Sequence, residues 1–349
     1  MFGLELLMML ASASLCKSLP TSDSNCFPYG SAELPKDLSP PDVPLDEWRC
    51  PSSMAYGFQG FGYPLEVSDC SDESNSFETM STDFAQMKRD FGAKIVRLYY
   101  PTCLESTVFE NALKAAVAND IAVIFQVWTD FGNSDDWKKS QQAIYDVLDS
   151  DEFGPIAPYV VHSIDFGSEP ITDNLDGGGQ QFIDDLAAFR ERVNSYGIPA
   201  GISENWDRPG DMKSSDGASL GDLGQQVKDN SDYAHAHIMP YYLTSIPLSG
   251  AWDYIEREME WINETVGLPT MITETQWAWG ENDSHNIPRD DLTVDGYTQY
   301  WKRFDEECLT FKKYQIGWFI HVWRGESTFD MLYPDGNGYV IPDWRPSTC

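Results

Sequence analysis

The sequence has few basic residues. Lys and Arg together number 23 against 56 Asp and Glu, which gives a formal charge of -33 at pH 7. Such a chain repels polyanions, so neither nucleic acid nor an anionic membrane surface is an expected partner. The acidic residues are spread along the chain and not gathered in one tail, which is typical of a well-solvated surface. With 42% hydrophobic and 13% aromatic residues, the composition is that of a globular protein and not of a disordered one.

Several signatures of other protein classes are missing. After the N-terminus no apolar run approaches the ~18–20 residues of a membrane span. No G-x-S-x-G segment occurs, so a serine hydrolase elbow is unsupported. The glycines of 57–62 are followed by Tyr63-Pro64 and not by a helix start, which argues against a nucleotide-binding loop. No CxxC occurs, and the wide cysteine spacing does not suggest zinc.

Histidine is also scarce, with five in the chain. His235-Ala236-His237 resembles a metal-binding pair, but strand alternation places both side chains on one face with no evident third ligand. His321 is compatible with a cleft-lining residue and equally with a structural one. The sequence therefore predicts no metal and no cofactor.

The N-terminus resembles a signal peptide. Residues 4–10 are apolar apart from Glu5, and Ala11-Ser12-Ala13 is a small-residue cleavage pattern, although a positively charged start is missing. We expect a signal peptide over residues 1–15, the alternative being a disordered start. Loss of a leader that includes Cys16 leaves six of the seven cysteines, enough for three disulfides, whereas cleavage at the Ala-Ser-Ala pattern leaves Cys16 as an odd thiol.

Two glycosylation sequons fit the same compartment. They are Asn263-Glu264-Thr265 and Asn282-Asp283-Ser284, which matter only in an exported protein. We expect a secreted, disulfide-bonded glycoprotein in the extracellular space or the cell wall.

The chain divides into an extension and one large domain. Residues 16–52 are rich in Pro, Ser and Asp and have no periodicity, so we expect an N-terminal extension. Residues 53–349 alternate short apolar runs with amphipathic segments, which is typical of repeated strand–helix units. Apolar residues spaced by three and four predict helices over 77–91, 182–196, 252–266 and 297–311. Eight strands are expected, at 54–60, 94–99, 121–128, 160–167, 199–203, 236–240, 270–273 and 316–322.

Eight such units over about 290 residues predict an α/β fold of the (β/α)8 TIM-barrel class, the structural alternative being a doubly wound open sheet. In such barrels chemistry is built where the strands end. Glu169 follows the expected strand 160–167, and Glu274 follows 270–273. Two carboxylates on separate strand ends are the minimum equipment for cutting a glycosidic bond. Either Glu alone could instead pair with Arg97, and Glu204 and Glu326 are spare carboxylates, interpreted as substrate contacts or surface residues.

Aromatic residues gather at the same strand ends. Sugars present flat apolar faces that stack on aromatic rings, so a polysaccharide cleft is expected to have aromatic walls. Any one of these residues is also compatible with ordinary packing. Those expected to bind substrate are Trp128, Trp206, Tyr242, Trp277, Trp279 and Trp323.

Four segments resemble glycoside hydrolase family 17, the β-1,3-glucanase family of clan A, and most closely its fungal-type members. Residues 94–99 (KIVRLY) are similar to its IRLY segment, 166–169 (FGSE) to VGNE, 239–242 (MPYY) to HPYF, and 271–277 (MITETQW) to ITETGWP. The resemblance covers about residues 54–341. It differs at Ser168, where the clan has Asn, and at Gln276 and Ala278, where the family has Gly and Pro.

The resemblance implies a TIM-barrel enzyme that retains anomeric configuration. It implies that Glu169 is the acid/base, that Glu274 is the nucleophile, that Arg97 and Tyr99 support the nucleophile, and that Tyr241 lies beside the pair. Retention requires carboxyl groups about 5–5.5 Å apart. The Asn that Ser168 replaces normally bonds the sugar 2-hydroxyl, so the rate and the substrate of this chain are open to change.

The expected activity is that of a secreted endo-β-1,3-glucosidase, a monomer acting on β-glucan. Endo action is inferred from the many aromatic strand ends, which suggest several subsites along an open cleft. Two alternatives stay open. One is a β-1,3-glucan transglycosylase that remodels cell walls with the same residues. The other is an inactive barrel that binds glucan.

Overall fold

The structure is a computed structural model, and it describes residues 24–132, 134–177, 179–281, 287–336, 338–347 and 349. The expected signal peptide, Cys16 and the sequon at Asn282 lie outside the described residues. Asn263 of the other sequon is exposed. None of the described helices is long and apolar enough to cross a membrane.

Eight parallel strands close into a barrel, each paired with the next and β8 with β1. The (β/α)8 prediction is confirmed, and the open-sheet alternative is wrong, because pairing of β1 with β8 leaves the sheet no free edge. The strands are β1 (Gly57–Pro64), β2 (Ile95–Tyr99), β3 (Ala122–Val127), β4 (Val161–Ser168), β5 (Ala200–Glu204), β6 (Ala234–His237), β7 (Thr270–Glu274) and β8 (Gly317–Ile320). All eight coincide in part with expected strands.

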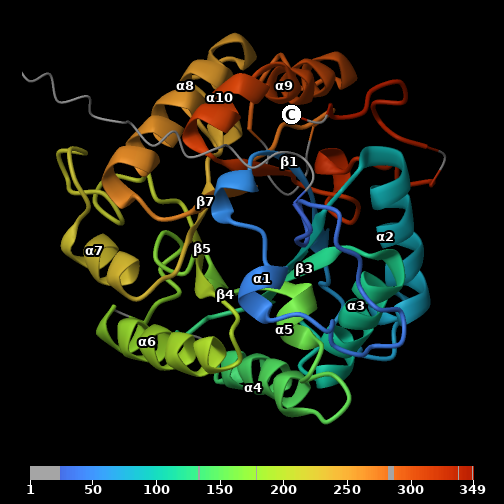
Figure 1. The fold of residues 1–349 in the computed structure, drawn as a ribbon. Helices are drawn as coiled ribbons and strands as arrows, with labels where there is room; N and C mark the ends of the chain where they lie inside the picture. Colours follow the sequence, from blue (N-terminus) through green and yellow to red (C-terminus); the bar gives the residue numbers. More distant parts are fainter. Residues whose placement is uncertain (1–23, 133, 178, 282–286, 337, 348) are drawn as a thin grey trace, which may run out of the picture.

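Helices surround the barrel as a ring (Figure 1). They are α1 (Leu45–Trp48), α2 (Phe77–Phe91), α3 (Ser106–Asn119), α4 (Asp136–Asp149), α5 (Ala157–Val160), α6 (Gln180–Ser195), α7 (Asp222–Asp229), α8 (Leu248–Trp261), α9 (Val294–Glu306) and α10 (Cys308–Tyr314). Each long helix buries its apolar side against the strands, as α2 does with Met80, Phe84, Met87 and Phe91.

The four predicted helices are present, with two changes. The stripe 297–311 is divided between α9 and α10, and the break at Glu307 directly precedes Cys308, which is bonded to Cys349. The stripe 252–266 continues α8 as a wider turn over Ile262–Val266 and ends at Gly267, whose φ of 66° suits glycine. Three longer helices, α3, α4 and α7, were not among the predictions.

The segment from residue 24 to the start of β1 lies across the N-terminal face of the barrel, with α1 in front of the strands (Figure 1). The Cys26–Cys50 disulfide closes this segment on itself. Trp48 Nε1 donates to the Tyr159 carbonyl at 2.8 Å, and Arg49 donates to the carbonyls of Pro158, Val161 and His162. Its division from a domain over 53–349 stays a prediction.

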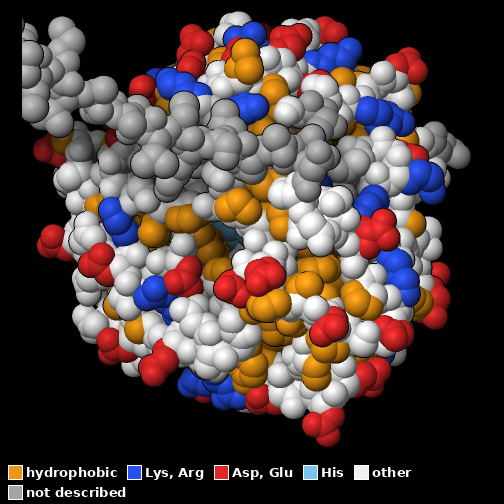
Figure 2. Space-filling model, in the orientation of Figure 1, with side chains coloured by type: hydrophobic (Ala, Val, Ile, Leu, Met, Phe, Trp, Pro, Cys, Tyr) orange, Lys and Arg blue, Asp and Glu red, His pale blue; other side chains and the backbone are white. Residues whose placement is uncertain are grey.

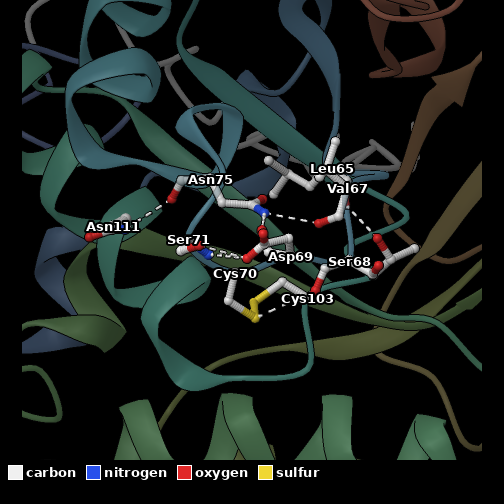
Figure 3. Close-up of a disulfide and its surroundings, with 10 residues drawn as sticks. Leu65, Val67, Ser68, Asp69, Cys70, Ser71, Asn75, Cys103 and Asn111 are labelled. Carbon is white, nitrogen blue, oxygen red and sulfur yellow. Dashed lines mark hydrogen bonds between the residues drawn. A yellow bond between two sulfur atoms is a disulfide. The ribbon is translucent and has the colours of Figure 1, made fainter.

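The six described cysteines form three disulfides, as the cysteine count predicts. Cys70–Cys103 joins the loop after β1 to the loop after β2 (Figure 3). Asn75 tightens the first loop by donating to the carbonyls of Val67 and Asp69, both at 2.9 Å. Because both loops leave the C-terminal ends of their strands, this disulfide braces one wall of the face where a TIM barrel carries its chemistry.

A cavity of about 200 Å³ lies at the opposite, N-terminal face, where apolar side chains gather around α1 and α5 (Figure 2). Its walls are mainly apolar and aromatic, among them Phe27, Trp48 and Tyr159. The two candidate glutamates are not among its lining residues.

Candidate functional site

The end of β4 is irregular, and this irregularity delivers Glu169. The pairing of β4 with β5 shifts between Asp165 and Ser168. Gly167 has a φ of 107°, and a Cβ there would lie 2.4 Å from Thr129 Oγ1, so this position requires glycine. Glu169 itself has a φ of 49°, which is uncommon for a side-chain-bearing residue and typical of functional sites.

Strand alternation at β4 is confirmed by its neighbours. Phe166 points outward and packs against Trp137, Phe182 and Phe189 of the helix layer. Asp165 points inward, where it accepts from Tyr233 Oη at 3.1 Å and lies 2.7 Å from His235 Nδ1. The local shift then turns both Ser168 and Glu169 toward the barrel interior, which simple alternation would not allow.

Glu274 comes from β7, and its neighbour on β6 is His237. A carboxylate oxygen of Glu169 and one of Glu274 lie within 4.8 Å of each other. His237 Nδ1 lies 3.6 Å from Glu169 Oε1 and 3.6 Å from Glu274 Oε2. Glu169 and Glu274, which were predicted at the ends of separate strands, therefore lie close together at the C-terminal end of the barrel.

Arg97 of β2 lies beneath this pair and is fully buried. Its Nη1 is 3.7 Å from Glu274 Oε2, and its Nε is 3.8 Å from Asp165 Oδ2. Its Nη2 donates to Ser203 Oγ at 3.0 Å and to Ser168 Oγ at 3.3 Å. The guanidinium thus balances two buried carboxylates and orients Ser168, the residue at which the resemblance to family 17 breaks down.

The pKa values of the two glutamates are driven apart. Burial raises the pKa of Glu169 well above its ordinary value, and the charges of Glu274 and Asp173 add to this against Arg208 and Arg97. Burial also disfavours ionisation of Glu274, but His237, His321 and Arg97 outweigh it and leave its pKa below the ordinary value. The two shifts favour a protonated Glu169 and an ionised Glu274, which is the division of roles that acid-assisted displacement requires.

His321 adds a second positive group. It follows β8, is buried, and its Nε2 lies 2.8 Å from Glu326 Oε2. Burial opposes charging, but Glu326 and Glu274 outweigh it and raise the pKa of His321 to about 9. Tyr99 packs edge-on against His321 at 5.5 Å and lies beside the Arg97 guanidinium at 5.2 Å, and its expected role in supporting the nucleophile stays a prediction. Glu326 is thus a partner of His321 and not a spare surface residue.

Three expected sugar platforms are interior residues. Trp206, Trp277 and Trp323 have no exposed surface. Trp206 Nε1 donates to the His235 carbonyl, Trp277 stacks on Tyr300, and Trp323 packs against Phe61. Their prediction as substrate-binding residues is wrong, because a side chain at a strand end can point into the core as readily as into the cleft.

The other three, Trp128, Tyr242 and Trp279, are partly exposed. Trp128 lies 3.9 Å from the Tyr100 ring, and Tyr242 Oη accepts from Gln276 Nε2 at 3.0 Å. Burial, and then the charge of Glu274, raise the pKa of Tyr242. Tyr241 is fully buried. Burial raises the pKa of its hydroxyl, and the charge of Arg289 partly opposes this increase. Tyr242, more than Tyr241, is therefore the tyrosine coupled to the glutamate pair.

The trio Glu169, His237 and Glu274 has the ligand types of a metal site. Arg97 argues against a cation there, because its guanidinium lies 3.7 Å from Glu274 and 3.4 Å from His237 Nε2. His235 does not join His237 in a pair, since it bonds Asp165 one layer deeper. Among the described residues no other cluster of this kind is present.

Glu204 was wrongly interpreted as a substrate contact or surface residue. It ends β5 and is completely buried. It accepts from the Ile171 N–H at 2.9 Å, from Thr172 Oγ1 at 2.5 Å and from the Asn205 N–H at 2.7 Å. Glu204 therefore anchors the loop that follows Glu169, which helps to hold that residue in its strained conformation.

We expect Glu204 to make stability depend on pH. Burial, and then the Glu169 charge, raise the pKa of Glu204 from 4.5 to about 8. Its folded pKa lies above its unfolded pKa, so its contribution is complete below pH 4.5 and is lost as pH rises through about 8. The unfolding midpoint should therefore be lower at pH 8 than at pH 5, and Glu204→Gln should flatten this difference in thermal unfolding.

Asp207→Asn is a matched control, because burial raises the pKa of Asp207 only to about 6. That variant should remove only the part of the pH dependence that arises up to about pH 6, and it should keep the loss of stability that Glu204 causes up to about pH 8. An unchanged pH slope in Glu204→Gln would contradict the assignment.

No family model matches the chain, and no curated protein matches it in sequence. Solved structures do match. The chain is similar to an active-site mutant of Rhizomucor miehei β-1,3-glucanosyltransferase in complex with laminaritriose, at 18% identity and a TM-score of 0.60 over 79% of this chain and 94% of that one. The glycoside hydrolase family 17 β-1,3-glucanosyltransferase from the same organism matches at 18% identity and 0.59, with the same coverage.

An uncultured Clostridium sp. β-glucuronidase matches at 16% identity with a TM-score of 0.55, over 84% of this chain and 49% of that one. These likenesses show the fold. The resemblance to family 17 carried by the sequence motifs thus has a structural counterpart among the solved members of that family.

Proposed function

We propose that this chain is a retaining glycoside hydrolase of β-glucan and a divergent member of glycoside hydrolase family 17. The observation that carries the proposal is the glutamate pair, with oxygens within 4.8 Å and pKa values shifted in opposite directions. Carboxyl groups about 5–5.5 Å apart suit retention, while inversion needs about 6.5–9.5 Å to admit a water.

In this mechanism Glu274 attacks the anomeric carbon while Glu169 gives its proton to the leaving oxygen. The glycosidic bond breaks, and an ester forms between Glu274 and the sugar. Glu169, now ionised, takes a proton from water as the water attacks the anomeric carbon, and Glu274 is released as a carboxylate. Both side chains keep limited exposure, 17% for Glu169 and 7% for Glu274, so bound sugar would displace most of the remaining solvent.

Substrate contacts are assigned to partly exposed side chains around the pair. Trp128 and Tyr100 supply aromatic surface after β3 and β2, Tyr242 supplies a hydroxyl after β6, held by the buried Gln276, and Trp279 supplies a further ring. Ser168 bonds Arg97 and is nearly buried, so it does not reproduce a long amide reaching the 2-hydroxyl. A β-1,3 linkage and endo action are the expected preferences, in a secreted, disulfide-bonded monomer acting in the cell wall.

Glucanosyl transfer is the second candidate, favoured by the similarity to the Rhizomucor miehei β-1,3-glucanosyltransferase structures. The same glycosyl ester is then resolved by a sugar hydroxyl in place of water.

Reducing-end release from soluble β-1,3-, β-1,4- and β-1,6-glucans tests the proposal. We expect release from the β-1,3-glucan, with β-anomeric products seen by proton NMR in the first turnovers. Products longer than the substrate, at high oligosaccharide concentration, would assign transfer. If the folded protein binds β-1,3-glucan but releases reducing ends from none of the three glucans, the enzymatic function is excluded. The chain would then be a barrel that only binds glucan.

A further inference from the structure

In the part of the chain that the structure describes, His237 is the imidazole that faces both glutamates. It is completely buried at the end of β6, and its Nδ1 is equidistant, at 3.6 Å, from Glu169 Oε1 and Glu274 Oε2. Among the described residues, neither His237 Nδ1 nor Glu274 Oε2 has a hydrogen-bond partner. Catalytic hydrogen bonds are often long before substrate binds and shorten in the complex. We therefore expect His237 Nδ1 and Glu274 Oε2 to form a hydrogen bond when substrate binds.

The other ring nitrogen determines where the proton lies. His237 Nε2 is 2.6 Å from Ser203 Oγ and 3.4 Å from Arg97 Nη2. A guanidinium can only donate, so a hydrogen on Nε2 would face another donor, and the contact favours Nε2 as an acceptor. Ser203 Oγ, which accepts from Arg97, can give its own proton to Nε2 while it accepts from Thr273 Oγ1, 2.9 Å away. This arrangement assigns the hydrogen of the imidazole to Nδ1, between the carboxylates.

The ring is also neutral. Burial lowers the pKa of His237 to about 3, and Arg97 and His321 add to this against the opposing charge of Glu274. A neutral ring with a protonated Nδ1 cannot bind a metal through that nitrogen and cannot act as a base there. Above about pH 3 the ring therefore offers a single N–H donor and acts on either glutamate as a dipole, and the charge by which it lowers the pKa of Glu274 is present only below that pH.

We propose that His237 is a positioning residue whose Nδ1–H donor follows the negative charge from Glu274 to Glu169 and back during each catalytic cycle. This rests on the proposed retaining mechanism. Before attack Glu274 is ionised and receives the hydrogen bond. Once the glycosyl ester forms, Glu274 is uncharged and Glu169 has become the carboxylate, so the hydrogen bond moves to Glu169. Hydrolysis restores the charge to Glu274, and His237 exchanges no proton.

The equal distances explain why one donor can serve both states. A hydrogen bond to a charged group contributes about 1.5–3 kcal/mol, more than a neutral one. A donor fixed beside only one carboxylate would stabilise one state and raise the barrier to leaving it. A donor midway between them can bond the carboxylate in both states and also in the transition state, where the negative charge is shared between Glu274 and Glu169.

A first test reads the proton without catalysis. In ¹⁵N-histidine-labelled protein, the resonances of His237, identified by their loss in His237→Asn, should show a neutral ring with the proton on Nδ1 from pH 4 to pH 8. In ¹³C-glutamate-labelled protein, His237→Ala should raise the pKa of Glu274. A proton on Nε2, or a titration of His237 near its ordinary pKa of about 6.5, would overturn the proposal whether or not the protein cleaves glucan.

A second test uses the pH profile of kcat/KM. His237→Ala should lower kcat/KM by roughly 10- to 100-fold and move the acidic limb, which reports ionisation of Glu274, to higher pH. His237→Asn places an amide N–H near the position of Nδ1 and should recover most of both effects. If all three proteins share one acidic limb, the donor role is excluded.

His162→Ala is the matched control. It removes another imidazole with a strongly lowered pKa, but at the start of β4, where the ring bonds Tyr29 and Ser163. Both limbs of its profile should coincide with those of the wild type. Failure of the wild type to cleave any glucan would count against the proposed function alone, and the NMR result would still decide the position of the proton.

Discussion

Glu274→Gln is expected to lower kcat on soluble β-1,3-glucan by on the order of 10⁴-fold or more, because an amide cannot form the glycosyl ester. The substitution keeps the shape of the side chain but removes a buried charge that faces Arg97, His237 and His321. Initial rates of reducing-end release measure the effect. A glucoside with fluorine at C2 and a good leaving group should label the wild type on the peptide that contains Glu274.

The control for this variant is Glu258→Gln. Glu258 of α8 is similarly buried and accepts from Lys213 Nζ at 2.6 Å, so its loss tests the cost of removing a buried charge by itself. We expect lower thermal stability for that variant and a kcat close to that of the wild type. Activity that survives Glu274→Gln, or a label on another peptide, would show that the nucleophile is misassigned.

Glu169→Gln is expected to have an effect that depends on the leaving group. On glucan, whose leaving alkoxide needs a proton, kcat should fall by about 10²–10⁴-fold, the usual contribution of general acid catalysis. On an aryl glucoside with an acidic phenol the first step needs little assistance. The glycosyl ester should then accumulate, and release of the phenol should show a burst.

Azide separates the acid/base from the nucleophile. A small anion can enter the space that Glu169→Ala leaves and attack the ester without a base, so azide should restore turnover of Glu169→Ala and yield the β-glucosyl azide. It should not rescue Glu274→Gln on the same route.

The pH profile gives an independent check of both assignments. The wild type should be bell-shaped, with a basic limb set by the raised pKa of Glu169 and an acidic limb set by the lowered pKa of Glu274. Loss of the basic limb in Glu169→Gln, measured on the aryl glucoside, supports the acid role. Retention of both limbs in that variant would contradict it.

Much of the fold follows from local pattern. The apolar runs that end at Gly167 and Thr273 are buried strands, and the spacing of Met80, Phe84, Met87 and Phe91 marks the inner face of α2. These patterns are readable because burial of one face requires the same residue type at a fixed period. Eight strands alternating with helices predicted a closed barrel, in which every strand has two neighbours, and the structure shows this closure.

Exposure was harder to predict than position. Trp128 and Trp206 both follow a strand, yet one is partly exposed and the other has no exposed surface. The difference is made by neighbours from distant parts of the chain, since Trp206 is enclosed and bonds the carbonyl of His235 on the next strand. Glu204 is a similar case, because its hydrogen bonds to Ile171 and Thr172 join two different loops.

The amino-acid sequence by itself determined that Glu169 and Glu274 stand at the ends of two strands of one barrel, because strand periodicity and chain order are local properties. The tertiary structure decided how they differ. Only barrel closure brings β2, β4, β6 and β7 around a common axis, and only there do Arg97 and His237 meet the two carboxylates. The pKa of a buried carboxyl depends on every charge and dipole within a few ångströms, and those neighbours come from residues far apart in the chain.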